Sequence, residues 1–252
     1  MSNYAIYFSP TGGTKRVSDI IRRELGCDRE IDLTKADVDY GKFAFEAGDV
    51  CLFAVPSYGG RVPGAAVQRI AQMSGKGAKA VLLAVFGNRA IDDTLLELKD
   101  VLLKAGFSCA AAVEAVAEHS IMHQYGKGRP DAVDAAELQG FAKSIAQRLK
   151  DEEPGDLQVP GNRPYREYNG VPLKPSVSAK CTLCGTCALL CPVGAINAET
   201  PNETDTSLCV SCMRCVSACP NHARRLNPLV LKTASLGLKK ACQDRKPNKL
   251  YI

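Results

Sequence analysis

The sequence lacks two features that would place a protein in or across a membrane. No apolar run approaches the roughly 18 residues of a membrane span, and residues 80–86, one of the longest, are strand-sized. The first residues lack the basic n-region of a signal peptide, and the apolar stretch after them is too short. We therefore expect a cytoplasmic protein without a membrane span. With 46% apolar and 23% charged residues, the 252-residue chain predicts one or two globular domains.

The chain contains twelve cysteines. Because a cytoplasmic compartment keeps thiols reduced, we do not expect them to form a disulfide framework. Eight fall within residues 181–219, and only Cys27, Cys51, Cys109 and Cys242 lie elsewhere. Buried free cysteine behaves as a small hydrophobe, which accounts for Cys51 and Cys109 in predicted strands. The cluster of eight instead indicates metal binding.

The first part of the sequence, residues 1–153, predicts an α/β domain. Apolar segments predict strands at residues 4–8, 30–33, 49–55, 79–86 and 107–116. Helical periodicity, with proline and glycine at helix ends, predicts helices at residues 17–25, 63–73, 92–105 and 131–150. Near-continuous apolar strands are typical of a parallel sheet that helices cover on both faces. We therefore expect a doubly wound, five-stranded parallel sheet.

The rest of the chain divides into three segments. Residues 154–178 contain five prolines and three glycines, which predicts a stiff linker. Its apolar side chains, among them Tyr168 and Leu173, suit packing against a domain. Residues 179–227 hold the cysteine cluster. Residues 228–252 form a basic tail with one weak amphipathic helix at 229–238.

The eight clustered cysteines form two C-x2-C-x2-C-x3-C-P runs. They are Cys181, Cys184, Cys187 and Cys191, then Cys209, Cys212, Cys215 and Cys219. This is the bacterial pattern for [4Fe–4S] ligation, in which the fourth cysteine of each run ligates the other cluster. Crossed ligation assigns Cys181, Cys184, Cys187 and Cys219 to one cluster, and Cys209, Cys212, Cys215 and Cys191 to the other. Zinc is the alternative, but a zinc ribbon needs only two C-x2-C knuckles, and the third cysteine would be surplus. The block resembles the two-cluster bacterial ferredoxins, which implies a small α+β domain with two [4Fe–4S] clusters.

A glycine- and hydroxyl-rich loop joins the first strand to the first helix. Its sequence, residues 9–14, is S-P-T-G-G-T. Free backbone N–H groups and the helix dipole favour an anion at such a turn, and Ser9, Thr11 and Thr14 add hydroxyl donors. The loop has neither the Walker lysine nor the spacing of a dinucleotide fingerprint. We therefore expect it to bind a phosphate monoester.

This loop matches the flavodoxin pattern [ST]-x-T-G-x-T, and residues 1–150 resemble a short-chain, FMN-binding flavodoxin domain. The whole chain resembles the flavodoxin–ferredoxin fusion proteins of anaerobic bacteria and archaea. The resemblance implies phosphate contacts from Ser9, Thr11, Gly12, Gly13 and Thr14, and ring-site contacts from Ser57, Tyr58, Gly59, Gly60, Gly87, Asn88 and Arg89. The chain has no tryptophan, so the tryptophan stacking of many flavodoxins is excluded. Tyr58 is the only aromatic residue in these three loops, which leaves room beside the ring for a substrate or redox partner.

The implied function is electron transfer between FMN, two [4Fe–4S] clusters and an external redox partner protein. The alternative is a ferredoxin-fed flavin reductase of a small molecule (a quinone, nitro compound or enone), with His119 or Tyr58 as proton donor. Both an electron carrier and an enzyme are compatible with these residues. For His119, the alternative to a proton donor is a loop histidine that packs beneath the flavin site without a catalytic role. A redox sensor is a third hypothesis, although no recognisable output domain supports it.

The formal charge of +5 does not indicate nucleic-acid binding. Residues 154–252 carry 13 lysines and arginines against 6 aspartates and glutamates, a net charge of +7. Two oxidised clusters with their thiolates contribute about −4, and an FMN phosphate about −2. The basic surplus therefore compensates anionic cofactors.

Overall fold

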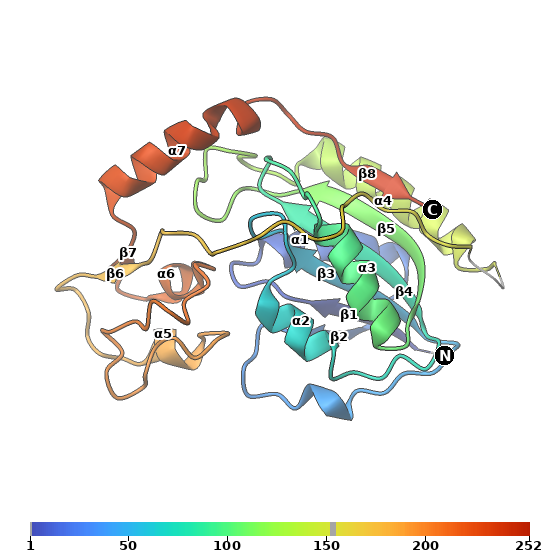
Figure 1. The fold of residues 1–252 in the computed structure, drawn as a ribbon, viewed down its shortest axis with the longest axis horizontal. Coiled ribbons are helices and arrows are strands. Elements are labelled where there is room, and N and C mark those ends of the chain that lie inside the picture. The colour runs from blue at the N-terminus through green and yellow to red at the C-terminus, as the bar shows by residue number, and fades with distance from the viewer. Residues whose placement is uncertain (1, 152–154) are drawn as a thin grey trace.

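The computed structural model describes residues 2–151 and 155–252. Its N-terminal part, here called the α/β domain (residues 2–151), is built on a parallel sheet (Figure 1). The five parallel strands are β1 (Asn3–Tyr7), β2 (Arg29–Asp32), β3 (Val50–Pro56), β4 (Lys79–Phe86) and β5 (Ser108–Val116). The helices are α1 (Gly13–Glu24), α2 (Gly64–Ile70), α3 (Thr94–Lys104) and α4 (Ala132–Arg148), with a 3-10 turn, η1 (Tyr40–Lys42).

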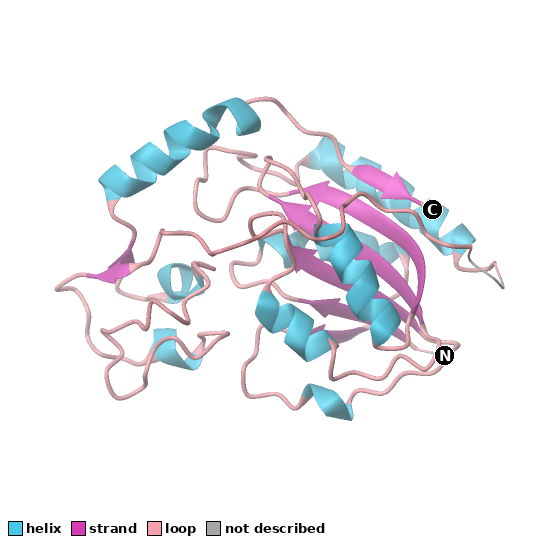
Figure 2. Cartoon of the chain, viewed as in Figure 1, coloured by secondary structure: helices cyan, strands magenta, loops and turns pink. Residues whose placement is uncertain are grey.

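The strand order is β2-β1-β3-β4-β5, which is the doubly wound order of flavodoxin-like folds. Side chains alternate across the sheet, so each strand contributes to two separate apolar cores. On one face, Phe53 and Leu82 pack with Leu98 of α3; on the other, Leu52 packs with Ile21 of α1 and Leu138 of α4. The doubly wound parallel sheet expected from the sequence is confirmed, and the carboxyl ends of its strands meet at one edge (Figure 2).

A sixth strand, β8 (Lys249–Tyr251), joins this sheet from the C-terminus, and the sequence did not predict it. It runs antiparallel to β5, with Glu114 opposite Lys249 and Ala112 opposite Tyr251. Before it, α7 (Pro228–Cys242) extends beyond the helix expected at 229–238, mainly at its C-terminal end. The Asn227 side chain caps its start by accepting from two backbone N–H groups. The tail therefore returns to the α/β domain.

The cysteine domain (residues 176–225) lies beside the carboxyl ends of the parallel strands (Figure 1). Its regular elements are short: β6 (Ser176–Val177), α5 (Thr186–Leu189), α6 (Arg214–Ala218) and β7 (Arg224–Arg225). β6 and β7 pair antiparallel. Because each element is so short, packing within the domain rests mainly on its loops.

The linker reaches the cysteine domain along the surface of the α/β domain. The backbone N–H of Asn162 donates to Asp93 Oδ1 over 2.9 Å, Arg163 pairs with Asp100, and Leu157 is buried in the core on the α3 face. The expected boundary between residues 153 and 154 lies outside the described residues. Within the described parts of the chain, no helix is both long enough and apolar enough to cross a membrane.

Candidate cofactor-binding sites

The loop between β1 and α1 exposes the start of a helix. Gly12 precedes the helix with φ 85°, in the left-handed region that favours glycine, and it has no side chain to cap the helix. Ser9 fixes the loop, because its N–H donates to Thr34 Oγ1 and its Oγ accepts from Lys15 N, both over 2.9 Å. Ser9 thus satisfies one first-turn amide group, and the other amide groups of this turn need acceptors from outside the helix. The loop is therefore suited to a phosphate.

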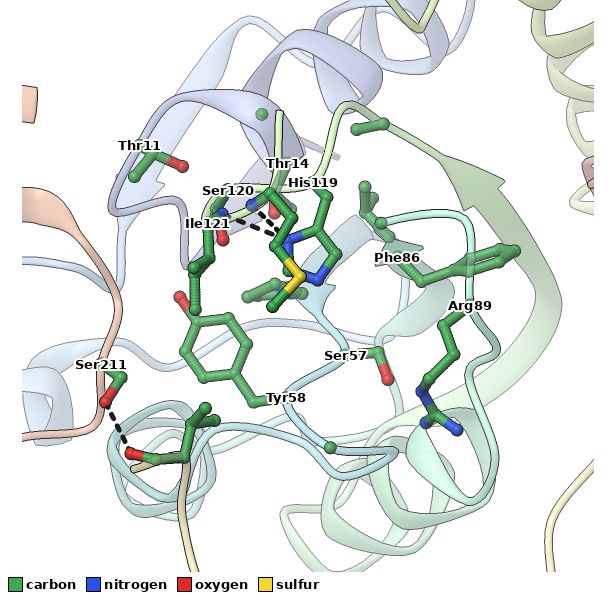
Figure 3. A pocket seen from close by; sticks show the side chains of 18 of the residues that line it. Thr11, Thr14, Ser57, Tyr58, Phe86, Arg89, His119, Ser120, Ile121 and Ser211 are labelled. Atoms are coloured by element: carbon green, nitrogen blue, oxygen red, sulfur yellow. Dashed lines mark hydrogen bonds between the residues drawn. The ribbon is translucent and has the colours of Figure 1, made fainter. Parts of the chain in front are cut away.

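A cavity of about 240 Å³ lies at this edge of the sheet. Of the predicted FMN residues it is lined by Ser9, Thr11, Gly13, Thr14, Ser57, Tyr58, Gly59, Gly87 and Arg89. Residues from elsewhere in the chain close its other side, namely Tyr168, Val171, Leu173, Val210, Ser211 and Leu238. Figure 3 shows Tyr58, His119 and Ser211 around this space. The cavity thus lies between the α/β domain, the linker, the cysteine domain and α7.

Tyr58 and Gly59 form a tight turn beside the cavity. The N–H of Tyr58 donates to Arg61 O over 2.9 Å, and the N–H of Arg61 donates back to Tyr58 O over 3.2 Å. Gly59 has φ 60°, and a Cβ there would lie 2.3 Å from the ring of Tyr168. Glycine is therefore required for the linker tyrosine to approach. Burial raises the pKa of Tyr58, and the neighbouring Cys212 adds to the rise.

Tyr168 is a cavity residue that the sequence did not identify, although it lies in the linker predicted to pack. Its ring brings a second aromatic group to the ring site, so Tyr58 is not alone there. Its hydroxyl is buried and has no hydrogen-bond partner among the described residues. Since buried polar groups are nearly always hydrogen-bonded, this hydroxyl fits a cavity that holds a polar ligand.

His119 is held in one orientation at the back of the cavity. Its Nδ1 accepts from the N–H groups of Ile121 and Met122 over 3.1 and 3.2 Å (Figure 3). Burial lowers the pKa of His119 to about 4, so the ring is neutral at pH 7 with its hydrogen on Nε2. Nδ1 is occupied by these two N–H groups, so Nε2 is the ring nitrogen left to face a ligand. A role for His119 as proton donor stays a prediction.

Three predicted FMN residues are not among the cavity-lining residues: Gly12, Gly60 and Asn88. The Asn88 side chain is 3% exposed and turns toward the C-terminal segment. Its Nδ2 donates to Cys242 O and Asp244 O, and its Oδ1 accepts from Lys246 N. At Gly60 a Cβ would lie 2.3 Å from Asp92 Oδ2. Asn88 and Gly60 therefore have structural contacts away from the cavity.

The eight clustered cysteines surround two further small cavities, in the grouping that crossed ligation predicts. The outer cluster site is lined by Cys181, Cys184, Cys187 and Cys219, and the inner cluster site by Cys191, Cys209, Cys212 and Cys215. In both runs, the backbone N–H four residues after the fourth cysteine donates to its sulfur: Ala195 to Cys191 over 3.3 Å, and Ala223 to Cys219 over 3.2 Å. The two halves thus repeat one local design.

The two cluster sites differ in exposure. Cys184 of the outer site is exposed, whereas Cys212 of the inner site is buried. Burial raises the pKa of Cys212 to about 12 and that of Cys215 to about 11. Free thiolates are disfavoured there, so these sulfurs need a bound metal to ionise.

The inner cluster site borders the large cavity. Val210 and Ser211 line the large cavity, and they lie between Cys209 and Cys212, which line the inner cluster site. Ser211 Oγ donates to Val171 O over 3.1 Å, and Arg214 Nη1 donates to Pro10 O over 3.1 Å. One short loop thus separates the two spaces.

Comparison with known proteins identifies the second part of the chain. The family model described as "4Fe-4S binding domain" matches residues 177–197 and 203–225, one match over each cysteine run. The chain therefore contains a 4Fe–4S binding domain, and the iron–sulfur prediction is confirmed over the zinc alternative. No match was found among curated protein sequences.

Several solved structures are similar to the α/β part. The Streptococcus pneumonia TIGR4 flavodoxin is 19% identical (59% of this chain, 99% of that chain, TM-score 0.41). The Megasphaera elsdenii flavodoxin is 17% identical (57% and 98%, TM-score 0.40). Rubredoxin oxygen:oxidoreductase from Desulfovibrio gigas is 16% identical (59% and 36%, TM-score 0.41).

Proposed function

We propose that this chain is an iron–sulfur flavoprotein that passes electrons between two [4Fe–4S] clusters and FMN and serves an external redox protein. The observation that carries the proposal is the stretch 209–212. Cys209 and Cys212 line the inner cluster site, and Val210 and Ser211 between them line the large cavity. A cluster and a flavin in these two spaces are separated by a single loop.

The residues around the large cavity suit FMN. The free amide groups at the start of α1 and the hydroxyls of Thr11 and Thr14 would hold the phosphate. Tyr58 and Tyr168 would border the ring, and the unpartnered Tyr168 hydroxyl would gain an acceptor. Bound FMN supplies a centre that exchanges one or two electrons, which matches it to one-electron clusters. Val171, Leu173 and Leu238 line the cavity with apolar side chains, which suits the flavin ring.

The reductase alternative has weaker support. It needs an open face over the flavin and a nearby proton donor. Linker and α7 side chains cover the cavity, and neither candidate donor has a pKa near neutrality. The pKa of His119 is about 4, and that of Tyr58 is raised by burial.

Anaerobic purification followed by metal and flavin analysis tests the composition. We expect about eight iron, eight acid-labile sulfide and one FMN per chain. Zinc, or iron without flavin, would contradict the proposal.

A kinetic experiment tests the electron path. Holoprotein is mixed anaerobically with less than one equivalent of reduced methyl viologen, and cluster and flavin absorbance are followed together. If electrons pass within the chain, the rate of flavin reduction after the clusters are reduced is independent of protein concentration. A rate of flavin reduction that rises in proportion to protein concentration would indicate transfer between molecules and would contradict the proposed path.

A further inference from the structure

Arg69, in the last turn of α2, is a half-buried cation at the contact between the α/β domain and the cysteine domain. Its Nη1 donates to Leu33 O and its Nη2 to Pro192 O, both over 2.5 Å. Its guanidinium also lies over the ring of Tyr40, 5.7 Å from the centroid. Among the ion pairs of the described residues, none includes Arg69, and burial lowers its pKa.

Asp32 favours the charged form of Arg69 through space, but it forms no ion pair with it. A half-buried charge without an ion-pair partner is costly, so a further anion nearby would stabilise this arginine. Pro192 directly follows Cys191, which lines the inner cluster site. A [4Fe–4S] cluster with four thiolates carries a charge of about −2 when oxidised and about −3 when reduced. The inner cluster would therefore be the missing partner of Arg69.

Two other cations beside the inner cluster site show the same pattern. Arg214 donates to Pro10 O, and its buried Nε has no partner in the described structure. Lys174 donates to Cys209 O. By contrast, Arg22, Arg61 and Arg129 of the α/β domain each pair with a carboxylate. At the outer site, the buried Arg224 likewise forms no ion pair, and its Nε has no partner in the described structure. The lack of carboxylate partners is thus a property of the surroundings of both cluster sites.

We propose that Arg69 sets the reduction potential of the inner cluster from across the domain contact. This inference rests on the proposed function, since it assumes that the inner site holds a [4Fe–4S] cluster. Arg69 belongs to the α/β domain, whereas every ligand of the inner cluster belongs to the cysteine domain. The inner cluster therefore has its higher potential only while the two domains are docked. Arg69 acts as a positioning and tuning residue, not as a ligand.

The sign follows from the charges. A cation stabilises the reduced cluster more than the oxidised one, because the reduced cluster carries the larger negative charge. Loss of the Arg69 charge therefore disfavours reduction and lowers the potential. We expect a change of about tenfold in the one-electron equilibrium constant, which corresponds to about 59 mV.

The test is an anaerobic redox titration of the full holoprotein, monitored by EPR, with two variants at this position. Arg69→Met removes the charge, and Arg69→Lys keeps it while removing the planar fork. Arg23→Met removes an exposed arginine of α1 and controls for net charge. If Arg69→Met fails to retain iron, Arg69→Gln replaces it as the neutral variant.

We expect the neutral variant to lower one of the two cluster potentials and to leave the other unchanged. In Arg69→Lys and Arg23→Met, the one-electron reduction equilibrium constant of each cluster should stay within about twofold of its value in the unmodified protein. An unchanged titration in the neutral variant would overturn the inference. The inference would also be overturned if Arg69→Lys shifted the potential as much as the neutral variant, because the role of Arg69 would then be structural. Equal shifts of both cluster potentials would overturn it as well. A protein without iron or FMN would instead fail the composition analysis above, so the two failures are distinguishable.

Discussion

The contact between Asn88 and the C-terminal segment yields a quantitative prediction. Asn88 follows β4 with φ 64°, a left-handed conformation, and its side chain makes three hydrogen bonds to the backbone of residues 242–246. Two substitutions separate the contribution of the hydrogen bonds from that of the backbone conformation. Asn88→Gly removes the hydrogen bonds without backbone strain, and Asn88→Ala also forces alanine into the left-handed region.

The magnitude follows from these contacts. Each hydrogen bond contributes about 0.5–1.5 kcal/mol, so three give about 1.5–4.5 kcal/mol. We expect Asn88→Gly to lower the free energy of unfolding by about 2–3 kcal/mol. The loss stays below the maximum because the carbonyl groups that Asn88 releases regain hydrogen bonds to water. Asn88→Ala should lower the free energy of unfolding by about 1–2 kcal/mol more, because alanine is strained in the left-handed conformation. For a chain of this size, 2–3 kcal/mol corresponds to a fall in Tm of about 4–12 °C.

The assay combines thermal unfolding with hydrogen exchange of residues 242–251. Both variants should speed exchange in this segment and weaken FMN retention, because α7 contributes Leu238 to the cavity cover. Arg245→Ala is the matched control in the same segment. It removes an ion pair to the exposed Asp131 and one to the buried Asp134, which keeps its pair with Arg129. Because Arg245 itself is exposed, this should cost about 1 kcal/mol. The reasoning is refuted if Asn88→Gly is as stable as the control, or if exchange in the segment stays unchanged.

Three further predictions concern the cofactor sites. The folded pKa of His119 is about 4 against about 6.5 unfolded. The free energy of unfolding, relative to that of His119→Asn, should therefore fall as the pH drops from 6.5 to 4, by about 2 kcal/mol at pH 5. Urea unfolding that gives the same difference between the two proteins at pH 7 and at pH 5 would contradict this. Thr14→Val should weaken FMN binding about tenfold or more and leave riboflavin, which has no phosphate, unaffected; equal losses in fluorescence titrations with both ligands would exclude a phosphate contact. Cys212→Ser should reduce iron from about eight to about four per chain, whereas the buried Cys27→Ser should retain it; full iron content in Cys212→Ser would remove Cys212 from the ligand set.

The sequence predicted the regular core of the fold well, because its signals are local and strong. Each of the five apolar segments became a parallel strand, and the helix expected at 92–105 is α3, Thr94–Lys104. Cysteine spacing also predicted which four cysteines share each cavity, since the two runs repeat one loop design.

The elements that the sequence missed depend on distant partners. β8 has only three residues, and its strand character comes from pairing with β5 across more than a hundred residues. Asn88 lies in a loop that the flavodoxin resemblance assigns to the ring site, but its side chain satisfies the C-terminal backbone instead. Tyr168 has no periodic pattern around it, and only the three-dimensional path of the linker brings it to Gly59.

The position of β8 changes how the cysteine domain is attached. Because the chain leaves the α/β domain after α4 and re-enters its sheet at β8, the cysteine domain is topologically an insertion anchored at both ends. A domain on a single tether can rotate away and sample a wide volume, whereas one closed into a loop cannot. A cut in the linker would therefore leave the two halves joined through the C-terminal strand. The short route between inner cluster and cavity is thus a property of chain topology as well as of the contact surface.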